Sequence, residues 1–161
     1  MSGIQFYRAE DADGEVFHQE PMAPATIEGL NRFMNEGGSQ GAEVKQLCSI
    51  PGFSIAVGWF KSNLPAPLHQ HDADCLYHVV GGSMRMGGRD LEKGDGVFVP
   101  ANTPYTFTAG PEGVEVLEFR HVAQCSAKVL ASSAAYWDKI VNVAASSRDR
   151  WAAEKRPTER A

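Results

Sequence analysis

The sequence predicts an all-β fold, an antiparallel sandwich or barrel with helices at its two ends, and two observations support this prediction. Short apolar runs fill residues 42–120, and Gly, Pro, Asn and Asp separate them at close intervals. No helical period interrupts these runs, which is typical of successive antiparallel strands. After Ser132 the apolar residues recur at steps of three and four, which predicts an amphipathic helix.

The predicted strands are short segments rich in β-branched and aromatic residues. In chain order they are EVKQLCSI, FSIAVGWF, CLYHVV, SMRM, GVFVP, YTFTA and VEVLEF. The segments between them, such as PG, NLPAP, EKGDG and PANTP, contain residues that favour turns. We therefore assign residues 42–122 to the barrel.

The N-terminal residues 1–41 are expected to form an arm and a short helix. Residues 1–25 contain acidic residues and prolines, and we interpret them as an arm or an edge strand. In the segment ATIEGLNRFMNEGG, apolar residues fall at helical spacing and two glycines end the run. This segment predicts a short helix that precedes the first barrel strand.

The C-terminal residues 123–161 are expected to form an amphipathic helix and a polar tail. The apolar positions of one helix face are Tyr136, Trp137, Ile140, Val141, Val143, Ala144 and Trp151. This face is expected to pack against the outside of the barrel. The tail EKRPTERA is polar and is expected to fray. All three segments are expected to belong to one domain.

Composition narrows the classes of function. The 161 residues suffice for one domain with its own core. A net charge of −5 disfavours binding to nucleic acid or to an anionic membrane, since both need clustered Lys and Arg. Three cysteines form no disulfide framework, and no signal peptide or membrane-spanning run is found. These features predict a cytoplasmic protein.

A histidine pair marks the candidate site. His69 and His71 are two residues apart, so on a strand both imidazoles project from the same face. Imidazole binds zinc, iron, copper, nickel and manganese, so the pair alone does not select a metal. The alternative interpretation is two surface histidines beside a loop.

In two motifs the sequence resembles the small single-domain members of the cupin superfamily. The first motif, G-x5-H-x-H-x3–4-E-x6-G, is represented by His69, His71 and the closing Gly82. The second, G-x5-P-x-G-x2-H-x3-N, is represented by Gly94 and Pro100 within LEKGDGVFVPANTPYTF. The resemblance covers about residues 42–120. It implies a jelly-roll β-barrel and one divalent transition metal, namely Fe, Zn, Mn or Ni.

Carried over by position, the family's four metal ligands fall on His69, His71, Cys75 and Tyr105. The usual Glu is thus Cys75, and the usual third His is Tyr105. Cys75 either supplies a thiolate ligand or fills space as a small buried residue. Tyr105 binds metal as a phenolate, donates a hydrogen bond to substrate, or fills the barrel mouth. If Cys75 faces inward, alternation turns Tyr77 inward and His78 outward.

An apolar cavity is expected near the mouth of the barrel. Its predicted apolar lining is Phe60 or Trp59, Met84 or Met86, Phe98, Phe107 and Leu117. Its predicted polar residues are Tyr105, Tyr77, Arg85 and Glu118. Such a cavity suits a small, partly aromatic or aliphatic molecule. Asp72 and Asp74 are expected to be turn residues or hydrogen-bond partners of a ligating imidazole.

The predicted function is a metal-dependent enzyme, most simply a dioxygenase, that acts on a small diketone-like or phenolic molecule. In this hypothesis His69 and His71 hold the metal, and Tyr105 orients the substrate or stabilises negative charge. The alternatives are a cupin lyase or isomerase, a binding module that has lost part of its metal site, and metal-free catalysis. The only other expected partner is a second copy of the chain, paired through a barrel edge or an exchanged N-terminal strand.

Overall fold

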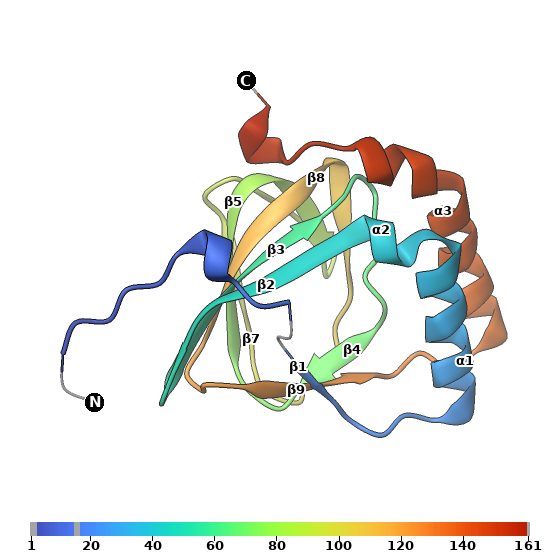
Figure 1. Cartoon of the computed structure of the whole chain (residues 1–161). Helices are drawn as coiled ribbons and strands as arrows, with labels where there is room; N and C mark the ends of the chain where they lie inside the picture. The colour runs from blue at the N-terminus through green and yellow to red at the C-terminus, as the bar shows by residue number, and fades with distance from the viewer. Residues whose placement is uncertain (1–2, 15–16, 161) are drawn as a thin grey trace.

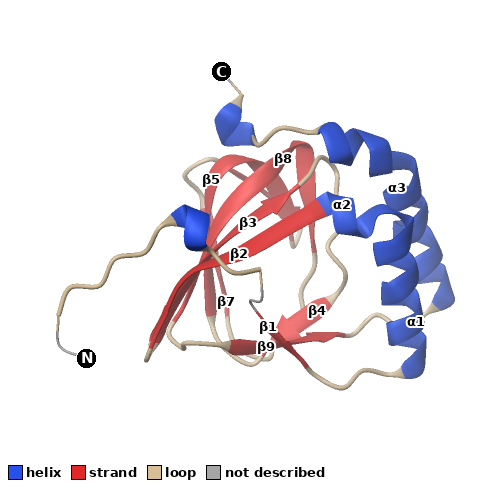
Figure 2. Ribbon diagram, in the orientation of Figure 1, coloured by secondary structure: helices blue, strands red, loops and turns tan. Residues whose placement is uncertain are grey.

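The structure, a computed structural model, describes residues 3–14 and 17–160. Its strands form two sheets, and the helices α1, α2 and α3 lie along one side of them (Figure 1). Figure 2 shows the same separation of strands from helices. The all-β prediction is therefore confirmed at the level of a mostly β architecture with flanking helices.

The larger sheet has six strands, and all of its pairs are antiparallel. Its main path runs in the order β2-β3-β8-β5-β6, with β7 paired to β5. The strands are β2 (Ala42–Ile50), β3 (Phe53–Phe60), β5 (Cys75–Met86), β6 (Arg89–Glu92), β7 (Gly96–Val99) and β8 (Phe107–Arg120). On β5 the residues Cys75, Tyr77 and Val79 are buried and His78 is exposed, as alternation predicted.

The smaller sheet carries the histidines. It has the order β1-β9-β4, with β1 at Phe17–Gln19, β9 at Cys125–Val129 and β4 at His69–His71. β4 is antiparallel to β9, whereas β1 pairs with β9 in parallel. Strands thus extend beyond the predicted barrel region 42–122 on both sides. Three- and five-residue strands leave too short a pattern to be recognised in a sequence.

The helical layer consists of two packed segments. The first is formed by α1 (Pro24–Phe33), η2 (Met34–Gly38) and α2 (Ser39–Gly41), and the second is α3 (Ala134–Ala153). The predicted apolar face of α3 is buried, with Trp137 and Trp151 almost fully so. α3 lies against α1, η2 and α2. Among the described residues, no helix is long and apolar enough to cross a membrane.

The prediction that the C-terminal tail frays is wrong. η3 (Pro157–Glu159) and the residue before it are attached to the large sheet. Arg156 donates hydrogen bonds to Glu43 and Glu115, and the amide of Thr158 donates to Glu115. Glu115 is buried, so its carboxylate requires these donors, and the tail supplies them. A further short helix, η1 (Ala9–Asp11), lies in the N-terminal arm.

Candidate metal centre and cavity

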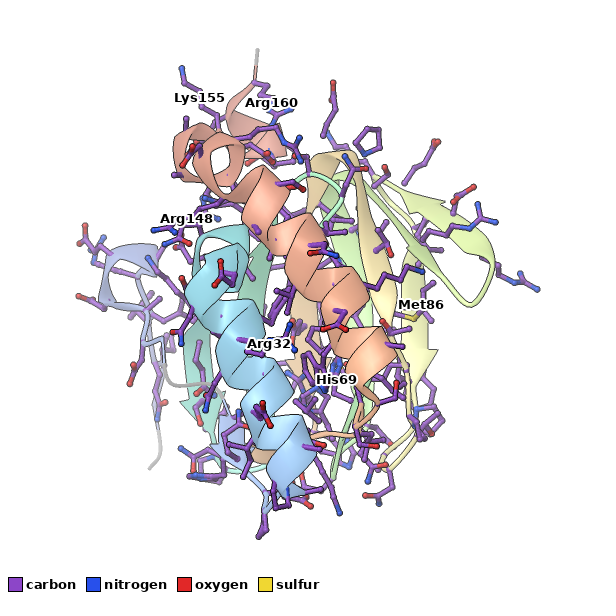
Figure 3. All side chains as sticks on the ribbon, turned by 90° about the vertical axis from the view of Figure 1, so that its right-hand side faces the viewer. Arg32, His69, Met86, Arg148, Lys155 and Arg160 are labelled. Carbon is purple, nitrogen blue, oxygen red and sulfur yellow. The ribbon has the colours of Figure 1, made fainter. Side chains whose placement is uncertain are left out.

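β4 places His69 and His71 on one face, as the two-residue spacing predicted. Both imidazoles line a single cavity of about 340 Å³. Their ring centroids are 5.1 Å apart, and His71 is buried. In Figure 3 His69 lies behind α1 and α3, on the side of the molecule that the helices cover. The alternative of two surface histidines is therefore wrong.

Backbone carbonyls fix the tautomer of each imidazole. His69 Nδ1 donates to the carbonyl of Pro67 at 2.6 Å, and His71 Nδ1 donates to the carbonyl of Ser126 at 2.9 Å. Because a carbonyl can only accept, Nδ1 carries the proton and Nε2 keeps its lone pair. Burial lowers the pKa of both histidines, that of His71 to about 4, with a smaller contribution from the charge of Arg120. Both rings are therefore neutral at pH 7.

Two tyrosines lie beside the histidines. The backbones of Tyr105 and His69 are hydrogen-bonded in both directions, and their ring centroids are 4.4 Å apart. The hydroxyls of Tyr77 and Tyr105 share a short hydrogen bond, and Tyr77 lines the cavity. Burial raises the pKa of both tyrosines, so both phenols keep their protons at neutral pH. One of the two hydroxyl protons is used in their mutual hydrogen bond, so the pair has one proton left to donate to a bound molecule.

Cys75 faces the interior but does not line the cavity. Burial raises the pKa of its thiol to about 12, so the sulfur is a neutral thiol near pH 7. The nearby Asp72 and Asp74 accept hydrogen bonds from the amides of Ser126 and Ala101. Neither aspartate bonds an imidazole directly, but Asp72 holds the residue whose carbonyl orients His71.

A buried ion pair completes the polar cluster. Arg120 donates to Glu118 at 2.8 Å, and both side chains are almost fully buried. Glu118 lines the cavity, and it is the cross-strand partner of Tyr77. The guanidinium of Arg120 lies over the ring of Phe17, which in turn contacts the ring of His71. Arg120 was not predicted, although alternation from Val116 through Glu118 would have turned it inward.

The predicted cavity lining is partly confirmed. Phe60, Phe107, Tyr77 and Glu118 line the cavity as expected. The other predicted residues, which do not line it, are Trp59, Met84, Met86, Arg85, Phe98, Leu117 and Tyr105. Arg85 and Phe98 are exposed because, in the alternation along β5 and β7, their neighbours Met84 and Val99 are the buried residues. The helices and β1 supply unpredicted lining, namely Phe17, Gln19, Leu30, Phe33 and Met34.

No protein-family profile and no curated protein sequence matches this chain. Several solved structures do. Pumpkin pro-11S globulin aligns over 57% of this chain and 29% of its own, at 17% identity and a TM-score of 0.52. An RmlC-like cupin from Shewanella frigidimarina aligns over 50% of this chain and 76% of its own, at 21% identity and a TM-score of 0.45. At these identities the likeness shows a shared fold alone, and this fold is consistent with the predicted cupin architecture.

Salicylate 1,2-dioxygenase from Pseudoaminobacter salicylatoxidans, solved with gentisate, aligns over 65% of this chain at 16% identity and a TM-score of 0.48. The aligned part is 34% of the dioxygenase chain. Likeness at these identities shows at most a shared fold and leaves the reaction open. The chemistry must therefore be argued from the residues of the cavity.

These residues could hold a metal only with fewer ligands than the four that the cupin motifs supply. Among the described residues, no three His, Cys, Asp or Glu side chains gather closely enough to hold a metal ion. The histidine pair does meet the requirement for ligation, since each Nδ1 is bonded and each Nε2 is free. Tyr105 is the oxygen donor beside His69. The chain thus offers two imidazoles and a phenol at positions where the cupin motifs have three histidines and a glutamate.

Proposed function

We propose that this chain is a metal-dependent cupin enzyme, most simply a dioxygenase, that acts on a small diketone-like or phenolic molecule. His69 and His71 hold one divalent transition metal (Fe, Zn, Mn or Ni) through Nε2. The observation that carries the proposal is the pair of Nδ1–carbonyl hydrogen bonds, which leave the Nε2 lone pairs available on two histidines that line one cavity. Ligating histidines are held in this way in metalloproteins.

The surrounding residues have separate roles in this proposal. A bound metal supplies Lewis acidity and, as iron, a place for dioxygen. Tyr105 either completes the ligand set or, as a neutral phenol bonded to Tyr77, donates to an oxygen that gains negative charge. Cys75 is the remaining candidate ligand, but its buried neutral thiol outside the cavity lining favours a space-filling role. The apolar walls keep water from the bound molecule.

Metal content tests the proposal. Untagged protein is analysed by elemental mass spectrometry as purified and after reconstitution with each of the four metals. We expect about one metal per chain, and a loss of at least tenfold in affinity for His69→Ala and for His71→Ala. His78→Ala is the matched control, because His78 is exposed on the outer face of β5. No metal under any loading condition would overturn the proposal.

Two further variants assign the remaining ligands. Cys75→Ser should keep its metal, because a thiol outside the cavity contributes little to the site. Tyr105→Phe should keep the metal with reduced affinity if the phenol ligates, or with unchanged affinity and reduced turnover if it only donates a hydrogen bond. If Cys75→Ser loses the metal as completely as His71→Ala, the thiol is a ligand after all.

A second candidate function is metal-free binding or catalysis. The absence of a third His, Cys, Asp or Glu ligand among the described residues favours it. In the catalytic form, His69 Nε2 takes a proton and Tyr105 gives one, as in a cupin lyase or isomerase. Protein that binds small phenols but no metal, and that loses turnover in His69→Ala, would support this candidate instead.

A further inference from the structure

One wall of the cavity is apolar, in contrast to the polar histidines, and it comes from the first helical segment. Leu30 and Phe33 of α1 and Met34 of η2 line the cavity together with Phe60 and Phe107 of the large sheet. Phe33 is buried, whereas Met34 is 41% exposed. Phe33 therefore lies on the inner part of this wall, and Met34 lies where the cavity meets solvent. All three helical side chains are apolar.

Close packing holds this wall in place. α1 and η2 lie against α3. A side chain at Gly29 would overlap the ring of Trp137, and one at Gly37 would overlap the backbone of Ala144. Trp137 is itself fixed by a hydrogen bond from its indole to the carbonyl of Ala131. The wall therefore has little freedom to retreat from a larger ligand.

The charges of the cavity also restrict what it accepts. Among the described lining residues, Glu118 is the one carboxylate, and Arg120 pairs with it from behind. An anionic ligand would face the Glu118 carboxylate, whereas a hydroxyl group could donate to that carboxylate or to an imidazole Nε2. A cationic ligand would find no second carboxylate on the described walls. The cavity thus favours a neutral molecule with a hydroxyl.

We propose that the ligand of this cavity is a neutral hydroxylated molecule whose apolar part packs on the wall of Leu30, Phe33 and Met34, and that Phe33 limits the length of that part. The proposal deepens the proposed function by naming a substrate class, and it rests on the same cavity. It does not depend on a metal, because the wall and the Glu118–Arg120 pair act on the ligand directly.

Calorimetric titration with a series of 4-alkylphenols, from phenol to 4-hexylphenol, tests the proposal on the full chain with and without a chelator. Affinity should rise about fourfold for each added methylene until the wall is reached, and then stop rising or fall. In Phe33→Ala this limit should move by at least two methylenes. Met34→Ala, at the solvent-exposed edge, should move it by less, and serves if Phe33→Ala fails to fold.

Two controls make the result decisive. Ile27→Ala lies on the same helix, exposed and outside the cavity lining, and should leave the limit unchanged. The 4-alkylbenzoates of equal length should bind at least tenfold more weakly in chelated protein. An unchanged limit in both wall variants, equal binding of benzoates, or no binding of any phenol overturns the inference. Protein that shows the length limit for phenols but takes up no metal under any loading condition would overturn only the proposed enzyme. Protein that binds metal but shows no length limit would overturn only this inference.

Discussion

At the scale of single residues, Glu118 and Arg120 are two charged side chains whose burial in the interior carries a large cost in free energy. Each would cost several kcal/mol to bury alone, and their mutual attraction offsets that cost only while both are present. Arg120 also has a buried Nε without a hydrogen-bond partner, so the pair is imperfectly satisfied. The pair is therefore better explained by the chemistry of the cavity than by stability.

Glu118→Gln should destabilise the protein by about 3 kcal/mol, because it leaves the Arg120 charge buried without a counter-ion. The double variant Glu118→Met, Arg120→Met should be considerably more stable than the single one. Urea denaturation followed by tryptophan fluorescence measures both. Asp138→Asn breaks the exposed pair with Arg32 and should cost less than about 1 kcal/mol. A double variant less stable than Glu118→Gln would contradict the argument.

The three cysteines should differ in reactivity. Cys48 is partly exposed, whereas Cys75 and Cys125 are buried and burial raises their pKa values to about 12 and about 11. A disulfide reagent at pH 8 should therefore modify one thiol quickly in native protein and all three in urea. Cys48→Ser should abolish the fast phase. A fast phase that persists in this variant would show that the interior near Cys75 is open.

At the scale of elements, the large sheet depends on glycine where β5 and β8 approach each other closely. Gly82 of β5 has a φ of 69°, and a side chain there would overlap the carbonyl of Gly113. Gly88, in the turn between β5 and β6, has a φ of 77° but faces open space. Gly82 is also the closing glycine of the first motif. The positive φ and the close carbonyl explain why the motif has glycine at this position.

Gly82→Ala should cost at least about 3 kcal/mol, since it adds a backbone clash to the strain of a left-handed residue. Gly88→Ala should cost only the strain, about 1 kcal/mol. Thermal unfolding of the two variants against wild type compares them directly. Equal losses in both would mean that the close approach of β5 and β8 relaxes without penalty.

The elements also explain which features a sequence can predict. Alternation within FSIAVGWF, CLYHVV and VEVLEF predicted β3, parts of β5 and β8, and the inward turn of Tyr77. The prediction of two strands in place of β5 and two in place of β8 is wrong, because each strand continues through glycines that favour turns. β1 and β9 are too short for a pattern, and their pairing depends on contacts more than one hundred residues apart. The cavity lining was only partly predicted, because register decides which of two neighbours faces inward. Leu30 and Phe33 were assigned to a helix, but nothing local placed that helix over the histidines.

At the scale of the whole molecule, the outer face of the large sheet carries an apolar row that crosses several strands. Leu76 pairs with Phe98 on one side and with Phe119 on the other, and Phe119 pairs with Ile55. Leu76 is 48% exposed and Phe98 is 58% exposed. Single exposed apolar residues are ordinary, but a continuous row of them is typical of a surface that contacts another protein.

This row gives the expected homodimer a physical basis. The N-terminal arm of the same chain exposes Ile4 and Phe6 almost completely, so a second copy brings apolar side chains of its own. Light scattering coupled to size exclusion should give twice the mass of the chain at micromolar concentration. Leu76→Asp combined with Phe98→Asp should give the single-chain mass, because the charges oppose burial of the row.

The control for the dimer is Ile27→Asp, which places the same charge on an exposed helix position away from the sheet. It should remain dimeric. Removal of the first 14 residues distinguishes two modes of dimerisation. A dimer that exchanges its N-terminal arms requires those residues and should dissociate, whereas a dimer formed through the sheet face should persist. If wild type has the single-chain mass at all concentrations, the predicted homodimer is wrong.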